Sequence, residues 1–241
     1  MQDVVSTRAD TVCPKCALNK LCFPQALPIV YCALLPMANE KRIRMKRGDY
    51  LFRAGDMQTG IYAVKAGFLK TCVRLVDGQS RIIGFQKMGD VLGLNGLGTG
   101  AHKTDAIALN GCEVCEISID KFNTLLQHPT ESAYVRKLLA CELTHTENRA
   151  AVGALSAKQR VATFLLEMSE SWEHRGYSKN VFMLFMSRQE IGNFLGLTCE
   201  TVSRTLSYFQ SKHWIKVQGR NLHIQDISAL QSQLASATQR A

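Results

Sequence analysis

The stretch that decides the fold reads Ser187-Arg-Gln-Glu-Ile-Gly-Asn-Phe-Leu-Gly-Leu-Thr-Cys-Glu-Thr-Val-Ser-Arg204. Ser187 and Glu190, three residues apart, form a capping box, which predicts that a helix begins here. Gly196 provides the positive-φ residue that ends a helix sharply. Thr198 is a favourable N-cap for a second helix directly after it. Two short helices joined by a glycine turn are typical of a helix-turn-helix.

The second helix of this motif has an apolar face and a polar face. The apolar face follows helical spacing and consists of Val202, Leu206 and Phe209. On a polar face, an arginine can bond a guanine in bidentate fashion, a glutamate can accept from a cytosine amino group, and a serine can approach a thymine. A solvated face with a Glu200–Arg204 ion pair is the alternative, but the caps and the turn agree with a DNA-reading helix. The predicted DNA contacts are Ser187, Thr198, Glu200, Ser203 and Arg204.

A β-hairpin is predicted downstream of the motif. Apolar and polar residues alternate on both sides of the turn Gln218-Gly219-Arg220-Asn221. A hairpin in this place is the wing of a winged helix. Its basic residues Lys216 and Arg220 are predicted to contact DNA phosphates.

Composition bounds the class of protein. The 241 residues are 46% hydrophobic and 20% charged, as in a soluble globular protein of one large or two modest domains. The net charge of +9 suits a polyanionic partner. The longest apolar run, 26–38, contains two prolines and is too short to span a bilayer. No secretory signal opens the sequence, so we expect a cytoplasmic protein that binds no membrane.

Nine cysteines, an odd number, indicate reduced thiols rather than a disulfide framework. Cys13, Cys16 and Cys22 have the spacing C-x2-C-x5-C, which suits iron–sulfur or zinc binding, with incidental thiols as the alternative. Both kinds of site need a fourth ligand. Cys112 and Cys115 lie in a predicted strand over 112–117, where their odd spacing puts them on opposite faces. Periodicity does not choose between them.

The region from 41 to 119 differs from the rest of the chain in its glycine content and its short apolar runs. Eleven of the 17 glycines lie between Gly48 and Gly100, between short apolar runs. Many short strands punctuated by turns predict an antiparallel roll or barrel. The basic run 41–47 could contact DNA, but alternation around Ile43 and Met45 favours a solvated strand face.

A long helix is predicted after residue 128, up to about 155. Its apolar stripe has near-heptad spacing and a polar interruption, which predicts a weak dimer seam. The seam residues are Val135, Leu139, Leu143, Thr146 and Ala150. The predicted domains are a sensory domain over 1–127 with the cysteine loop 13–22 and the roll, a dimerisation helix over 128–155, and a winged helix-turn-helix over 156–241.

A roll, a long helix and a winged helix, in that order, resemble the CRP/FNR family of bacterial transcription regulators. Three details are similar to its oxygen-sensing FNR branch. Phe23-Pro24 follows the cysteine loop, Val114-Cys115-Glu116-Ile117 matches the stretch that supplies a fourth cluster ligand, and 191–204 is close to the DNA-reading motif. The resemblance implies an α+β fold with an N-terminal antiparallel β-roll of cupin-like, cyclic-nucleotide-binding type.

The same resemblance implies a cofactor and partners. The cofactor is a [4Fe-4S] cluster held by Cys13, Cys16, Cys22 and Cys115. In such proteins oxygen converts the cluster, the dimer weakens and DNA binding is lost. The implied partners are palindromic double-stranded DNA, a second copy of the chain and RNA polymerase.

Two positions depart from family patterns. Nucleotide-binding relatives hold a cyclic phosphate with Arg-Ser or Arg-Thr, where this chain has His102-Lys103-Thr104 and lacks the bidentate fork. Those relatives also place an arginine directly before the reading glutamate and prefer TGTGA half-sites. In this chain the residue before the reading glutamate is Cys199, so Arg204 is the one arginine left to read a guanine. The resemblance implies TTGAT half-sites for this combination.

Two other functions are compatible with parts of this sequence. The first is a regulator of the same fold that is gated by a small ligand or by thiol or zinc chemistry. The second is an enzyme, which the absence of a Ser/His/Asp order, paired carboxylates or a P-loop in the sequence disfavours. We therefore expect no enzyme.

Overall fold

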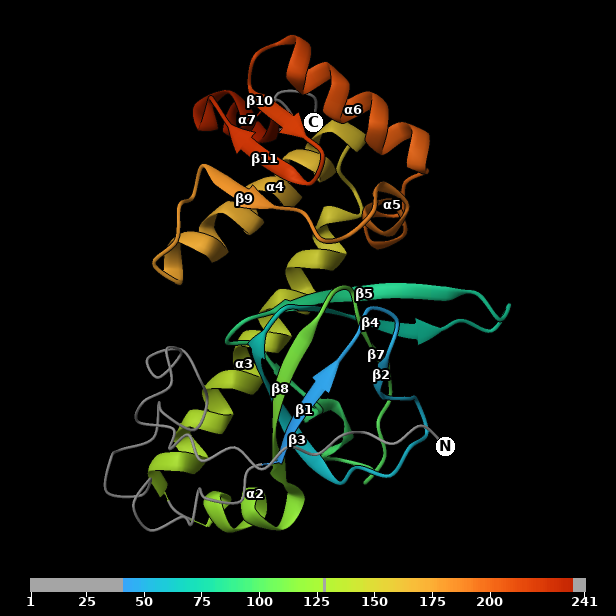
Figure 1. Ribbon diagram of the computed structural model, residues 1–241, viewed down its shortest axis with the longest axis vertical. Helices are drawn as coiled ribbons and strands as arrows, with labels where there is room; N and C mark the ends of the chain where they lie inside the picture. Colours follow the sequence, from blue (N-terminus) through green and yellow to red (C-terminus); the bar gives the residue numbers. More distant parts are fainter. Residues whose placement is uncertain (1–40, 128, 236–241) are drawn as a thin grey trace. The chain divides into compact units, whose positions relative to one another are not determined.

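The computed structural model describes residues 41–127 and 129–235. Contacts divide the chain after Leu143 into two compact units. The first holds strands β1 to β8, and the second holds the helix-turn-helix (Figure 1). The predicted ligands Cys13, Cys16 and Cys22 lie outside the described residues.

Two antiparallel four-stranded sheets make up the first unit, which confirms the predicted roll. One sheet has the order β1 (Lys41–Met45), β8 (Cys112–Ser118), β3 (Gly60–Ala66), β6 (Val91–Leu92). The other has the order β2 (Tyr50–Phe52), β7 (Asp105–Ala108), β4 (Phe68–Arg74), β5 (Ser80–Lys87). A short 3-10 helix, η4 (Leu94–Gly96), follows β6.

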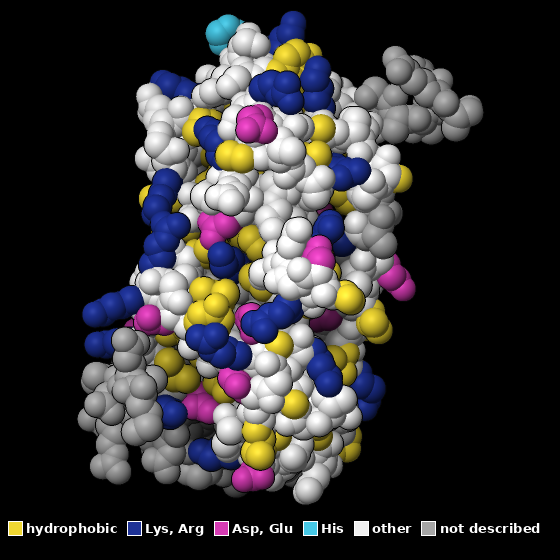
Figure 2. Space-filling model, turned by 90° about the vertical axis from the view of Figure 1, so that its right-hand side faces the viewer, with side chains coloured by type: hydrophobic (Ala, Val, Ile, Leu, Met, Phe, Trp, Pro, Cys, Tyr) yellow, Lys and Arg dark blue, Asp and Glu magenta, His cyan; other side chains and the backbone are white. Residues whose placement is uncertain are grey.

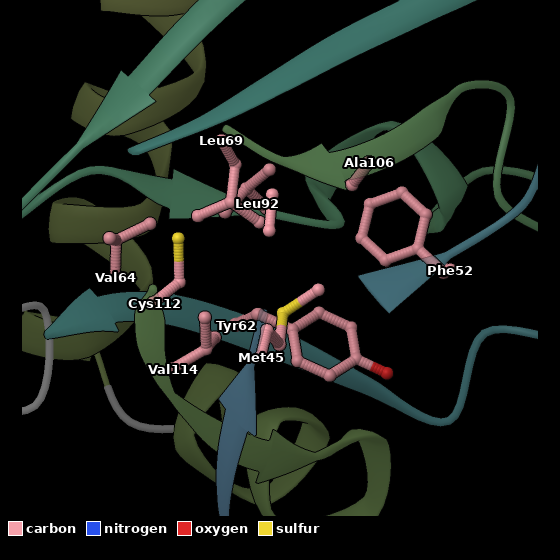
Figure 3. Packing of buried hydrophobic residues seen from close by; sticks show 10 residues of the cluster. Met45, Phe52, Tyr62, Val64, Leu69, Leu92, Ala106, Cys112 and Val114 are labelled. Atoms are coloured by element: carbon pink, nitrogen blue, oxygen red, sulfur yellow. The ribbon is translucent and has the colours of Figure 1, made fainter. Parts of the chain in front are cut away.

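The main core of the roll is built from side chains of both sheets (Figure 3). Successive residues of a strand point to opposite faces, so every second residue enters this core. Its members are Met45, Phe52, Tyr62, Val64, Leu69, Leu92, Ala106, Ala108, Cys112 and Val114. The core therefore takes Cys112 and Val114 from β8 but not Cys115.

A second cluster forms where two helices, α2 (Ile119–Leu126) and α3 (Pro129–Val152), pack on the roll. It contains Ile61, Ile117, Phe122 and Val135. Val135, a predicted seam residue, is 3% exposed, so it is used within its own unit. The remaining seam positions are 139, 143, 146 and 150, which are separated by alternating steps of four and three residues. One further step of three toward the N-terminus leads to position 136. Val135 lies one residue off that line, and this is why it faces the roll.

The long helix itself is confirmed, over 129–152 rather than 128–155. Leu139 is 38% exposed and Leu143 is 66% exposed, so both could meet a partner. The side chain of Ala150 lies outside the described set. Because the two units divide inside α3, the three-part domain scheme stays a prediction.

The second unit contains helices around a small antiparallel sheet. Its elements are α4 (Ala157–His174), β9 (Val181–Met183), α5 (Arg188–Leu195), α6 (Cys199–Ser211), β10 (Ile215–Gln218), β11 (Asn221–Ile224) and α7 (Ile227–Ala235). The predicted hairpin is β10–β11, and β9 adds a third strand through the pairing of Phe182 with Leu222. Across both described ranges, the helices are too short or too polar to cross a membrane.

Candidate nucleic-acid interface and cluster site

The first helix of the motif begins as its capping box predicts. The Glu190 amide donates to the Ser187 hydroxyl oxygen at 3.1 Å, and the Ser187 amide donates to the Glu190 carboxylate at 2.8 Å. Ser187 is exposed, and its hydroxyl oxygen already accepts the capping hydrogen bond. The predicted DNA contact at Ser187 therefore involves the N-terminus of α5 and not this hydroxyl alone. Gly196 ends α5 at φ 67° and ψ 39°.

Gly192 is a residue of this motif that sequence reasoning missed. A Cβ atom there would lie 2.6 Å from the backbone oxygen of Leu197, inside any normal contact. The turn therefore packs onto α5 more closely than another residue type allows. A glycine inside a helix pattern was the available signal, because glycine in such a position weakens a helix unless packing needs it.

The second helix, α6, presents the predicted polar residues outward. Thr198 caps it by accepting from the Thr201 amide at 3.1 Å, while Val202, Leu206 and Phe209 are at most 2% exposed. Glu200 and Arg204 are both exposed, and Ser203 is partly exposed. Within the described ranges no ion pair joins Glu200 to Arg204, whose side chain makes one long hydrogen bond, 3.5 Å, to the Thr201 hydroxyl.

The wing presents its two basic residues to solvent. Lys216 lies on β10 opposite His223, and Arg220 lies in the turn beside Gly219, whose φ is 60°. Both basic side chains are exposed. Lys and Arg side chains, dark blue in Figure 2, are spread over the viewed face among fewer Asp and Glu side chains. The surface thus carries the charge expected for a polyanionic partner.

Cys115 and Cys112 lie on opposite faces of β8, as their spacing predicts. Cys112 belongs to the main core, and its thiol donates to the backbone oxygens of Phe68 at 3.0 Å and Asn110 at 3.3 Å. Burial raises the pKa of the Cys112 thiol, which opposes the thiolate form that binds iron. Cys115 is 9% exposed and shares its strand face with Glu113 and Ile117.

A network of charges is centred on Glu113, which lies two residues before Cys115 on the same strand face. Arg42 pairs with Cys115 in the β1–β8 register. Glu113 has the ammonium of Lys65 at 2.6 Å and the guanidinium of Arg42 at 3.6 Å. The hydrogen bond from Lys65 is the main reason that the pKa of Glu113 lies below its ordinary value. The basic run 41–47 therefore starts as the predicted strand, but Arg42 on it is paired with Glu113 and mostly covered rather than solvated.

His102, in the segment His102-Lys103-Thr104 that departs from the nucleotide-binding pattern, is buried in the roll. Its ring stacks on Phe52 with centroids 3.7 Å apart and planes 7° apart, and the residue is 1% exposed. Neither ring nitrogen has a hydrogen-bond partner in the part of the chain that the structure describes. Burial lowers the pKa of His102, against a smaller opposite effect of Asp56. Lys103 is exposed and Thr104 is buried.

One donor of the predicted cluster can be tested against the structure. Cys115 has the right chemistry, a sulfur on a strand face that does not belong to the main core. The described residues contain no group of three or more His, Cys, Asp or Glu side chains that could hold a metal ion. The three other predicted donors are outside those residues, so the ligand set stays a prediction.

Comparisons with known proteins agree with both units. Residues 159–233 match the Crp-like helix-turn-helix domain, and residues 42–128 match the cyclic nucleotide-binding domain. The Transcriptional regulatory protein btr of Bordetella pertussis is 37% identical over 90% of this chain and 91% of its own. The chain belongs to the CRP/FNR family.

Other relatives support the same family. The Transcriptional activator protein Anr of Pseudomonas protegens is 36% identical over 94% of both chains. The Fumarate and nitrate reduction regulatory protein of Escherichia coli is 32% identical over 94% of this chain and 91% of its own. The solved structure of FixK2 from Bradyrhizobium japonicum has a TM-score of 0.74 and 26% identity, and the match covers 80% of this chain and 96% of that one.

Membership of the CRP/FNR family makes this chain a DNA-binding transcription regulator. The relatives named above regulate transcription and are not enzymes, so the expectation of no enzyme is confirmed. The α+β fold of roll, long helix and winged helix is confirmed as well. The individual DNA contacts remain predictions.

Proposed function

We propose that this CRP/FNR protein is controlled by oxygen through a [4Fe-4S] cluster on Cys13, Cys16, Cys22 and Cys115. Without oxygen it is a homodimer that binds TTGAT-type palindromes and contacts RNA polymerase in the cytoplasm. The observation that carries the proposal is the place of Cys115 on β8. Its side chain is directed away from the main core, on the face opposite Cys112.

The cluster ligands have to be thiolates, and basic residues lie on the strand face that carries Cys115. When bound, a cluster of this kind supplies a centre whose iron and sulfide react with oxygen. Arg42 lies across from Cys115, and Lys65 and Arg44 lie near Glu113 on the same face. Three basic side chains therefore lie on this face, each within 4.0 Å of the single carboxylate of Glu113. Cys112 has no such surroundings.

The proposed dimer uses the outward line of α3. Leu139 and Leu143 expose apolar surface on that line, and Thr146 is an exposed polar residue on the same line. A short apolar segment followed by a polar one gives a marginal association. A marginal dimer is what a small chemical change can shift from mostly formed to mostly broken.

The experiment is an absorbance spectrum of protein purified without oxygen, combined with iron and acid-labile sulfide analysis, before and after exposure to air. We expect a visible band that fades in air. Cys115→Ser should lower iron and sulfide content, whereas the matched control Cys112→Ser should leave both unchanged.

Two results would contradict this proposal. A colourless protein that holds zinc would favour the small-ligand or thiol regulator of the same fold. Loss of the cluster in Cys112→Ser together with its retention in Cys115→Ser would overturn the choice of fourth ligand.

A further inference from the structure

Arg160, in the first turn of α4, binds three backbone oxygens with one guanidinium group. Its Nε donates to the Leu155 oxygen at 2.9 Å, and one terminal nitrogen donates to the Leu195 oxygen at 3.1 Å. The other terminal nitrogen donates to the Gly153 oxygen. The planar fork of an arginine allows this arrangement, and a lysine ammonium does not reproduce it.

Two of the three oxygens lie at helix ends, and the third lies in the loop between α3 and α4. Gly153 directly follows α3, and Leu155 is two residues further on; Leu195 is the last residue of α5. Carbonyls at a helix C-terminus have no partner within the helix, and a positive charge there is favourable. One side chain therefore caps the end of the long helix and the end of the first DNA-motif helix together.

A second contact joins the same two helices independently. The guanidinium carbon of Arg149, in the last turn of α3, lies 5.8 Å from the centre of the Phe194 ring in α5. That ring also meets Phe164 of α4 edge-on, with centroids 6.0 Å apart. The end of α3, the start of α4 and the end of α5 thus form one connected block within the second unit.

This block lies directly before the DNA-reading helix. Leu195 is followed by the Gly196 turn, and Thr198 caps α6 three residues after Leu195. We propose that Arg160 is a positioning residue that ties the α5–α6 turn to the last turn of α3. The orientation of α6 then follows the end of the long helix. This inference rests on the DNA-binding role of the family and does not need the cluster.

The test uses the full chain with Arg160→Lys, which keeps the charge, and Arg160→Gln. The readouts are affinity for the palindrome that the wild type prefers, affinity for non-specific DNA, and melting temperature. We expect specific affinity to fall by about tenfold, a typical coupling between two sites, while non-specific affinity stays near wild type. The melting temperature should fall as well, because charged hydrogen bonds inside the folded chain are lost. Arg175→Lys is the matched control, because Arg175 donates to Ser171 within its own helix and should leave specificity unchanged.

A purely structural role would give a different result. If Arg160→Lys reduces specific and non-specific affinity by the same factor, the positioning role is wrong. Wild-type specificity in both Arg160 variants would overturn it as well. Failure of the proposed function is a separate result, because it would show in the wild type as absence of the cluster or of the TTGAT preference.

Discussion

Arg204 and Lys216 show how two exposed basic residues of one unit can have different tasks. Arg204 lies on the second turn of α6, where its fork could reach the edge of a guanine, and Glu200 lies one turn before it. Lys216 lies on the wing and offers a point charge. The first geometry can carry sequence information, and the second can only attract phosphate.

We expect the anaerobic protein to prefer TTGAT-N4-ATCAA over a TGTGA palindrome by about 1–3 kcal/mol per half-site. Arg204→Ala should erase this preference. Lys216→Ala should weaken both sites equally and reduce the salt dependence by about one unit per subunit. A competition titration at fixed salt measures all three, and equal affinity of the wild type for both palindromes would contradict the reading of α6.

His102 gives a pH dependence whose sign can be worked out. Burial holds its pKa below the ordinary value of about 6.5. As the pH falls through that value, the unfolded chain takes up a proton that the folded roll does not, so the free energy of unfolding falls. The largest slope is about 1.4 kcal/mol per pH unit.

We therefore expect His102→Phe to lose less stability than the wild type between pH 7.5 and pH 5.5. Phenylalanine keeps a ring against Phe52 and removes two buried nitrogens that have no hydrogen-bond partner among residues 41–127 and 129–235. Urea unfolding of both proteins at the two pH values is the measurement. The same pH dependence in both would show that His102 is not responsible.

At the scale of elements, the polar residue Thr146 in the proposed dimer contact of α3 can be tested directly. Leu139, Leu143 and Thr146 follow one another at heptad spacing, and the polar third member interrupts the line. Thr146→Leu should extend the apolar line and favour the dimer in air. Sedimentation in air and without oxygen is the measurement, with Lys137→Leu as a control off this line. A wild type that is equally dimeric in both conditions would remove the proposed switch.

Elements fixed by local hydrogen bonds were predictable from the sequence. The capping box of α5, the turn at Gly196 and the Thr198 cap each involve residues within four positions of one another. The hairpin β10–β11 is equally local. Contacts between distant segments were not predictable, because no residue pattern marks them. Examples are the pairing of Phe182 with Leu222 and the bond from Arg160 to Leu195.

For the molecule as a whole, the sequence predicted the order of the parts but not how each part packs. Glycine spacing indicated a roll without giving the order of strands in its two sheets. Apolar spacing indicated a long helix but did not show that Val135 is used inside the roll. The same holds for the candidate site. Alternation along the strand predicts that Cys112 and Cys115 lie on opposite faces, but only the packed core shows that Cys112 is the one directed into it.

If Cys115 holds the proposed cluster, the two faces of β8 also decide how a change at its sulfur reaches the long helix α3. Cys115 and Ile117 are next neighbours on one face, and Ile117 packs in the same cluster as Val135 of α3. A displacement at the sulfur would thus reach the long helix through one strand step and the packed cluster of Ile61, Ile117, Phe122 and Val135. Tightly packed side chains transmit strain. The proposed ligand and the long helix are therefore joined inside one packed unit, without an intervening loop, and a change at the sulfur would act on α3 as strain in its packing.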